Sequence, residues 1–295
     1  MKKYFACLLL LQFAVTFAFS QNLDSIQKDW TARMGGKLGI PYGNNASAGK
    51  YYDIRGFKMY CEVYGTGKPL LIIHGNGGSI SNFVYQVPYF SQKYKVIIAD
   101  SRAQGKSVDS GDSLTYEMMA DDYDALLDAM KIDSAYVIGW SDGGINALLL
   151  AIRHPEKVKK LAVTGANLRP DTTAVYQEVW DMVRPEYSTL KQKSTLDTKE
   201  KEELKLLRLL CDQPHIPLAD LHTITAPALV MGGDHDVIKF EHTMQIFQNI
   251  PKAYLWILPN SGHSTPVVYS GEFNKKVDDF FSTPYRVIKQ QGRFF

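Results

Sequence analysis

The chain has 295 residues, of which 45% are hydrophobic and 22% are charged, and its formal net charge is +2. This near-neutral balance argues against a nucleic acid or an anionic membrane as the partner, because both select strongly basic surfaces. After the first twenty residues, about 275 remain, which is enough for one large domain with a well-buried core.

Residues 1–20 have the pattern of a secretory signal peptide. Met1-Lys-Lys3 is the basic start, an apolar stretch runs to about Phe19, and Ala18-Phe-Ser20 supplies small residues for cleavage. We expect cleavage after Ser20 and an exported mature protein, periplasmic or secreted, with no stable membrane association. The alternative is an uncleaved anchor, which the short apolar run and its interruption by Gln12 disfavour.

The next segments alternate between strand-like and helix-like patterns. Residues 21–50 are an irregular lead-in that starts with a short helix at 23–34, and two antiparallel strands are predicted between Tyr51 and Tyr64. Strands near Leu70, Val96 and Tyr136 then alternate with helices at 116–130 and 144–154, and a further strand spans 158–164. This alternation predicts an α/β fold with a mostly parallel sheet and helices on both faces.

The strand rhythm stops at residues 167–222 and resumes at Pro227. The interruption is charged and favours helix, with helices predicted at 175–183 and 198–211. We therefore expect one domain over 51–281 that carries an insertion at about 167–222, followed by a C-terminal tail at 282–295. Cys7 leaves with the signal peptide, and we expect Cys61 and Cys211 to be free buried thiols rather than a disulfide.

The most informative motif is Gly139-x-Ser141-x-Gly143, which follows an apolar run and opens a helix-like segment. A sharp turn from strand to helix holds the serine in a strained conformation, and the flanking glycines let neighbouring chains pass closely. Its hydroxyl then stands exposed beside backbone N–H groups. Ser141 is therefore the candidate nucleophile of an acyl-transfer enzyme.

A Gly-rich loop upstream supplies backbone amides. The buried-strand pattern Pro69-Leu-Leu-Ile-Ile73 ends in His74-Gly-Asn-Gly-Gly78. Acyl transfer needs two N–H donors for the developing oxyanion, and we assign them to the backbone of Asn76 and Asp142. The alternative is an ordinary strand-to-helix connection. A phosphate-binding loop is excluded because no G-x-x-x-x-G-K-[ST] pattern follows.

A nucleophilic serine needs a general base and an acid to orient it. His263 follows the strand-like run at 253–258 and is the candidate base. Asp236, in the Gly233-Asp-His-Asp236 turn after the strand-like run at 228–231, is the preferred acid over Asp234. A metal site in this turn is disfavoured because adjacent residues of an extended loop point apart and no further ligand pattern supports it.

The order Ser141, Asp236, His263 is that of α/β-hydrolases. From about Tyr51 to Phe281 the chain resembles this superfamily, and its G-W-S-D-G-G elbow looks like that of biphenyl-hydrolase-like and valacyclovir-hydrolase-like serine esterases. Four motifs agree in order along the chain: H-G-N-G-G at 74–78, D-S-R-A-Q-G-K-S at 100–107, G-W-S-D-G at 139–143, and G-D-H-D with S-G-H at 233–236 and 261–263. The resemblance implies the α/β-hydrolase fold and makes the insertion at 167–222 a small helical lid over the site.

These motifs predict an exported serine hydrolase that cleaves a carboxyl ester of a small molecule through an acyl-enzyme, without a metal or organic cofactor. Trp140 and Asp142, which flank the serine, are candidate substrate contacts. An Asp142 carboxylate turned towards the acyl pocket would favour an α-amino ester, and the alternative is that Asp142 only interacts with the positive end of the following helix dipole. The alternatives are a carbon–carbon or small amide hydrolase of the same fold and, in a different class, a non-catalytic ligand-binding protein on a hydrolase scaffold.

Overall fold

A computed structural model describes residues 20–288 and 294. The predicted signal peptide therefore lies outside the described residues, apart from Ser20, which begins helix α2. Within the described ranges, no helix combines the length and the apolar character that a membrane crossing requires.

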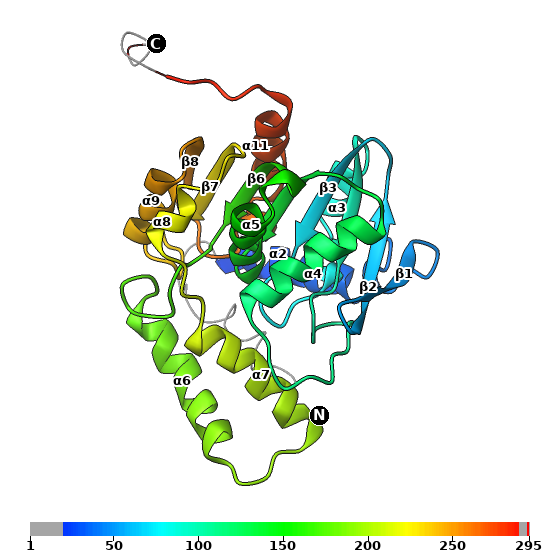
Figure 1. Ribbon diagram of the computed structural model, residues 1–295, viewed down its shortest axis with the longest axis vertical. Helices are drawn as coiled ribbons and strands as arrows, with labels where there is room; N and C mark the ends of the chain where they lie inside the picture. The colour runs from blue at the N-terminus through cyan, green and yellow to red at the C-terminus, as the bar shows by residue number, and fades with distance from the viewer. Residues whose placement is uncertain (1–19, 289–293, 295) are drawn as a thin grey trace.

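The centre of the molecule is an eight-stranded sheet with the order β1-β2-β4-β3-β5-β6-β7-β8 (Figure 1). β1 and β2 form the predicted antiparallel pair, β2 also runs antiparallel to β4, and all the other neighbours are parallel. The strands are β1 (Gly49–Ile54), β2 (Phe57–Tyr64), β3 (Lys68–Ile73), β4 (Tyr94–Ala99), β5 (Ala135–Trp140), β6 (Val158–Thr164), β7 (Ala228–Gly233) and β8 (Ala253–Leu258).

Helices cover both faces of this sheet, as predicted. β5 and β7 are buried along their whole length, as expected for parallel strands covered on two sides. The helices are α2 (Ser20–Met34), η1 (Ile80–Phe83), α3 (Gln86–Phe90), α4 (Tyr116–Ala129), α5 (Asp142–Arg153), η2 (Pro155–Lys157), α6 (Gln177–Gln192), α7 (Thr198–Asp212), α8 (Leu218–Leu221), α9 (Phe240–Asn249), α10 (Thr265–Val268) and α11 (Ser270–Ser282).

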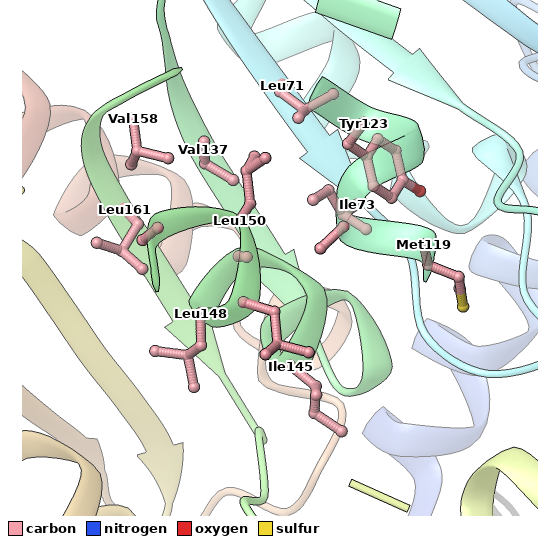
Figure 2. Close-up of a cluster of buried hydrophobic side chains, with 14 of the residues drawn as sticks. Leu71, Ile73, Met119, Tyr123, Val137, Ile145, Leu148, Leu150, Val158 and Leu161 are labelled. Carbon is pink, nitrogen blue, oxygen red and sulfur yellow. The ribbon is translucent and has the colours of Figure 1, made fainter. Parts of the chain in front are cut away.

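Two hydrophobic clusters hold the layers together. One packs α4, α5, α8 and α9 on the first face, and Figure 2 shows its centre, where α4 and α5 side chains meet those of β3, β5 and β6. The other packs α2, η1, α3 and α11 on the opposite face. Both faces of the sheet are therefore tightly packed, which fixes the positions of the strand ends and of the first residues of the loops that follow them.

The lead-in at 21–50 has the predicted form, a helix (α2) followed by irregular turns, and contacts with distant residues fix it in place. Trp30 of α2 is buried and donates an indole hydrogen bond to the Asn82 carbonyl oxygen at 3.1 Å. The buried carboxylate of Glu62 accepts from the backbone N–H groups of Gly43 and Asn45 at 2.8 and 2.9 Å. Contacts from distant parts of the chain therefore fix this segment, which local propensity does not reveal.

The predicted insertion forms two long helices, α6 and α7, which stand apart from the sheet in Figure 1. α6 continues through Pro185 to Gln192, whereas the helix predicted from the sequence ended at 183. The two helices share a hydrophobic cluster of their own, centred on Trp180 and Leu207. Cys211 of α7 and Cys61 of β2 are both buried and free, as expected.

Candidate active site

Ser141 occupies the turn between β5 and α5. Its backbone lies at φ 58° and ψ −124°, a strained conformation for a residue with a side chain. A Cβ on Gly143 would meet the Ile73 carbonyl oxygen at 2.0 Å, and one on Gly139 would meet the Gly143 carbonyl oxygen at 2.2 Å. Both glycines are therefore required by close approach of the backbone, which is the physical basis for the motif.

The structure brings the three predicted residues Ser141, His263 and Asp236 into one hydrogen-bonded chain. Nε2 of His263 lies 2.9 Å from the Ser141 hydroxyl, and Nδ1 lies 2.7 Å from Oδ1 of Asp236. Since the carboxylate can only accept, Nδ1 carries the proton and Nε2 is left to accept from the serine. The three residues follow β5, β7 and β8, whose carboxyl ends meet at one edge of the sheet.

The charge of Asp236 sets the basicity of the imidazole. Burial of His263 acts to lower its pKa, but the negative charge of Asp236, the hydrogen bond to it and a smaller contribution from Asp142 outweigh burial. The pKa of His263 therefore lies above its usual 6.5. Oδ1 of Asp236 also accepts from the Ile238 N–H at 3.1 Å, which fixes the carboxylate.

Asp234 has different partners from Asp236. Its Oδ1 accepts from the imidazole of His235 at 2.8 Å and from the Ser261 N–H at 3.0 Å. These hydrogen bonds, that of His235 first, lower its pKa to about 2. Asp234 therefore holds the loop that carries His263 but does not touch the imidazole itself in the described structure.

The backbone around Ser141 offers the two predicted N–H donors. The Ser141 N–H is engaged by the Thr164 carbonyl oxygen at 2.9 Å. Among the described residues, the N–H groups of Asn76 and Asp142 have no acceptor. A Cβ on Gly75 would lie 3.0 Å from Cβ of Ser141, so the Gly-rich loop passes directly beside the serine. Both amides are therefore available near its hydroxyl.

The Asp142 side chain is 2% exposed and lies in a mainly neutral environment. Its Oδ2 accepts from the side-chain amide of Asn76 at 2.9 Å. Burial raises its pKa to about 6, against the opposing effects of hydrogen bonding by Asn76 and Tyr116 and of the charge of His263. No lysine or arginine in the described part of the chain forms an ion pair with it. A carboxylate of this kind can pair with a cation that comes from outside.

Trp140 supports the loop that carries His263. It is 4% exposed, its ring packs edge-on against Phe83, and its indole N–H donates to the carbonyl oxygen of His263 at 2.9 Å. These contacts help to position His263, and a substrate contact by Trp140 stays a prediction.

Two further residues border the site and were missed by the sequence reasoning. Gly165, directly after β6, has φ +64° and faces the imidazole of His263. The hydroxyl of Tyr116, at the start of α4, is buried beside Asp142 and has no other described partner. The glycine after a strand end was a usable signal, whereas nothing in the pattern around Tyr116 connects it to a residue in another helix.

Comparison with known proteins places this geometry in a family. The family model described as alpha/beta hydrolase fold matches residues 68–210. Human serine hydrolase BPHL is 25% identical over 256 residues, which cover 81% of this chain and 88% of that protein. The chain belongs to the α/β-hydrolase superfamily.

Other proteins that resemble this chain are named for different substrates. A protein named 2-hydroxymuconate semialdehyde hydrolase, from Pseudomonas sp. strain CF600, is 24% identical, with 81% of this chain and 95% of that protein covered. The crystal structure of the enol-lactonase from Burkholderia xenovorans LB400 superposes with a TM-score of 0.68 and 22% identity, and covers 79% of this chain and 100% of that one. This hydrolase therefore has the predicted fold, a mostly parallel sheet with helices on both faces.

Proposed function

We propose that this protein is a serine hydrolase that cleaves a carboxyl ester of a small molecule through an acyl-enzyme. The observation that carries the proposal is the unbroken chain of hydrogen bonds from Ser141 through His263 to Asp236, beside two backbone N–H groups that have no acceptor among the described residues. Each of these parts has a defined task in acyl transfer.

In the acylation step, the Ser141 Oγ attacks the ester carbonyl carbon and its proton moves to Nε2 of His263. The carbonyl oxygen becomes an oxyanion that accepts hydrogen bonds from the N–H groups of Asn76 and Asp142. The bond to the leaving oxygen then breaks, and that oxygen takes the proton from His263. Asp236 keeps the imidazole in the correct tautomer and stabilises its transient positive charge.

Deacylation repeats these steps with water. His263 takes a proton from the water as its oxygen attacks the acyl carbon, and the same two N–H groups hold the second oxyanion. Collapse of the intermediate breaks the bond to Ser141 and returns the proton to its Oγ, which releases the carboxylic acid. All groups required for both steps belong to the protein, so the proposal needs neither a metal nor an organic cofactor.

Labelling with a fluorophosphonate probe tests the proposal directly. We expect stoichiometric labelling of the purified protein, and its loss in Ser141→Ala. The absence of labelling in the wild-type protein would favour a non-catalytic ligand-binding protein on a hydrolase scaffold. Two kinds of substrate then distinguish ester from carbon–carbon cleavage. Turnover of nitrophenyl acyl esters supports the esterase, whereas turnover of 2-hydroxymuconate semialdehyde alone, the compound in the name of the Pseudomonas relative, favours the carbon–carbon alternative.

We further propose that the protein is exported after cleavage at Ser20, which the basic and apolar pattern of residues 1–20 supports. Fractionation of cells that express the full chain tests this. Mature protein that begins at Gln21, outside the cytoplasm, is the expected result, and an intact N-terminus in the membrane fraction would replace export with anchoring.

A further inference from the structure

The side-chain amide of Asn76 joins three separate parts of the molecule. Its Nδ2 donates to Oδ2 of Asp142 at 2.9 Å and to the backbone carbonyl oxygen of Leu206 at 3.3 Å. Both partners are acceptors, so only the NH₂ end of the amide can satisfy them, and each takes one of its two hydrogens. Asn76 thereby links the Gly-rich loop to the start of α5 and to the lid helix α7.

The first of these bonds connects the two residues whose backbone N–H groups are the proposed oxyanion donors. Asn76 and Asp142 lie on different segments, after β3 and β5, and catalysis requires their N–H groups to converge on one point. Asn76 stands between Gly75 and Gly77, and Gly77 adopts a positive φ of 63°. The flanking glycines allow this loop several backbone conformations, so a side-chain bond that limits its movement affects the position of the Asn76 N–H group.

The second bond ties the same loop to the lid. Leu206 belongs to α7, and its neighbour Lys205 separately joins α7 to the body of the protein through the Asp109 carbonyl oxygen at 3.2 Å and that of Gly111. The lid therefore has one attachment that reaches the oxyanion loop and an adjacent one that does not. This pair provides a matched comparison on a single helix.

We propose that the Asn76 side chain is a positioning group, which holds the two oxyanion donors at a fixed separation through its hydrogen bond to Asp142. The inference rests on the proposed acyl-transfer function and deepens it. Its effect falls on the transition state, because the oxyanion forms only there, so kcat changes while substrate affinity changes little.

The test compares four variants with the wild-type protein on a nitrophenyl ester. Asn76→Ala and Asp142→Ala each keep the backbone N–H but remove the linking bond, and we expect kcat to fall by roughly 10- to 100-fold with KM within about threefold. The double variant should lose no more than about threefold beyond the poorer single variant, since both remove the same bond. Asp142→Asn, whose side-chain oxygen still accepts from Asn76, should recover most of the loss.

Lys205→Met is the control, because it removes the neighbouring lid attachment without touching the oxyanion loop. We expect its kcat to stay within twofold of the wild-type value. A second readout is inhibition by phenylboronic acid, whose tetrahedral adduct on serine places an oxygen at the oxyanion position. Its Ki should rise in Asn76→Ala by the same factor by which kcat/KM falls.

Three results would overturn the proposal: wild-type kcat in Asn76→Ala, multiplicative losses in the double variant, or an equal loss in Lys205→Met. Fluorophosphonate labelling of the wild-type protein keeps this test separate from the proposed function. A labelled enzyme that gives any of these results remains a serine hydrolase, but without the positioning role of Asn76.

Discussion

Gly165 leaves no room for a side chain beside His263: a Cβ there would lie 2.6 Å from Cε1 and 2.9 Å from Nδ1 of the imidazole. Contacts this short force one of the two groups to move. The loop after β6, which contributes no polar side chain to the hydrogen-bonded chain of Ser141, His263 and Asp236, therefore sets the position of the imidazole.

Gly165→Ala should accordingly lower kcat without removing any reacting group. The positive φ of 64° adds backbone strain to the contact. We expect kcat to fall by roughly 100-fold, because a displacement of a catalytic group by about 1 Å has an effect of this size. Steady-state kinetics measure it, and Gly271→Ala, where a Cβ meets no atom within 4 Å, is the control. Unchanged kcat in Gly165→Ala would show that the imidazole tolerates the displacement.

Replacement of the two neighbouring aspartates should separate orientation from loop stability. Asp236→Asn removes the charge that holds the imidazole, so kcat should fall by roughly 10³- to 10⁴-fold. Asp234→Asn weakens the bonds to Ser261 and His235, so it should lower Tm with a far smaller change in kcat. Kinetics and thermal unfolding of both variants make the comparison, and a reversal of the two effects would assign the orienting role to Asp234.

The activity should rise with pH as His263 loses its proton. Only the neutral imidazole accepts the serine proton, and Asp236 holds the pKa of His263 above 6.5 in the folded protein. The midpoint of kcat/KM against pH should therefore lie above 6.5 and move down in Asp236→Asn. A profile that is flat from pH 5 to 8 would remove histidine from the role of base.

The Asp142 carboxyl should make the fold less stable as pH rises. Its pKa is raised from 3.8 to about 6 by burial, so the folded state retains a proton that the unfolded chain releases. The contribution of this carboxyl to the free energy of unfolding is fully present below pH 3.8, and it is lost as the pH rises through about 6. Asp142→Asn has no such loss and should be more stable than the wild type by about 3 kcal/mol at pH 8, with no gain near pH 3.5.

Denaturant unfolding at the two pH values measures this difference. The exposed Asp53, replaced in the same way, is the control, since its ion pair with Lys58 lies on the surface. An equal gain in Asp142→Asn at both pH values would attribute the effect to packing rather than to ionisation.

Asp142 should also favour amino-acyl esters. A buried carboxylate that forms no ion pair with a lysine or arginine of the described chain gains a partner when a substrate ammonium group reaches it, and such a pair discriminates by roughly 1.5–3 kcal/mol. We expect higher kcat/KM for amino-acyl than for uncharged acyl nitrophenyl esters, and loss of the preference in Asp142→Ala. Equal ratios in both proteins would leave Asp142 as a helix-start residue alone.

The sequence predicts the sheet and the residues that follow its strands well, because parallel buried strands are continuous apolar runs and their ends share one edge. Ser141, Asp236 and His263 were predicted because each follows a strand of this kind and because they occur along the chain in the order Ser, Asp, His. The contact of Gly165 with His263, the contacts that fix the lead-in and the hydrogen bond from Trp140 to the His263 carbonyl oxygen were not, since each joins residues far apart in the chain. The helix at 177–192 was predicted too short because Pro185 reads as a stop signal when its tertiary support is unknown.

The α6–α7 pair buries most of its apolar side chains within itself, around Trp180 and Leu207. Leu209 of α7 is buried in the main core cluster and has to be retained, whereas the residues of the α6–α7 cluster can accumulate substitutions without loosening the sheet. Divergence of this hairpin alone would therefore yield enzymes with new selectivity and unaltered bond-breaking machinery. For protein engineers, it is a module to exchange as a unit, with α7 grafted so that the Leu206 carbonyl still meets Asn76.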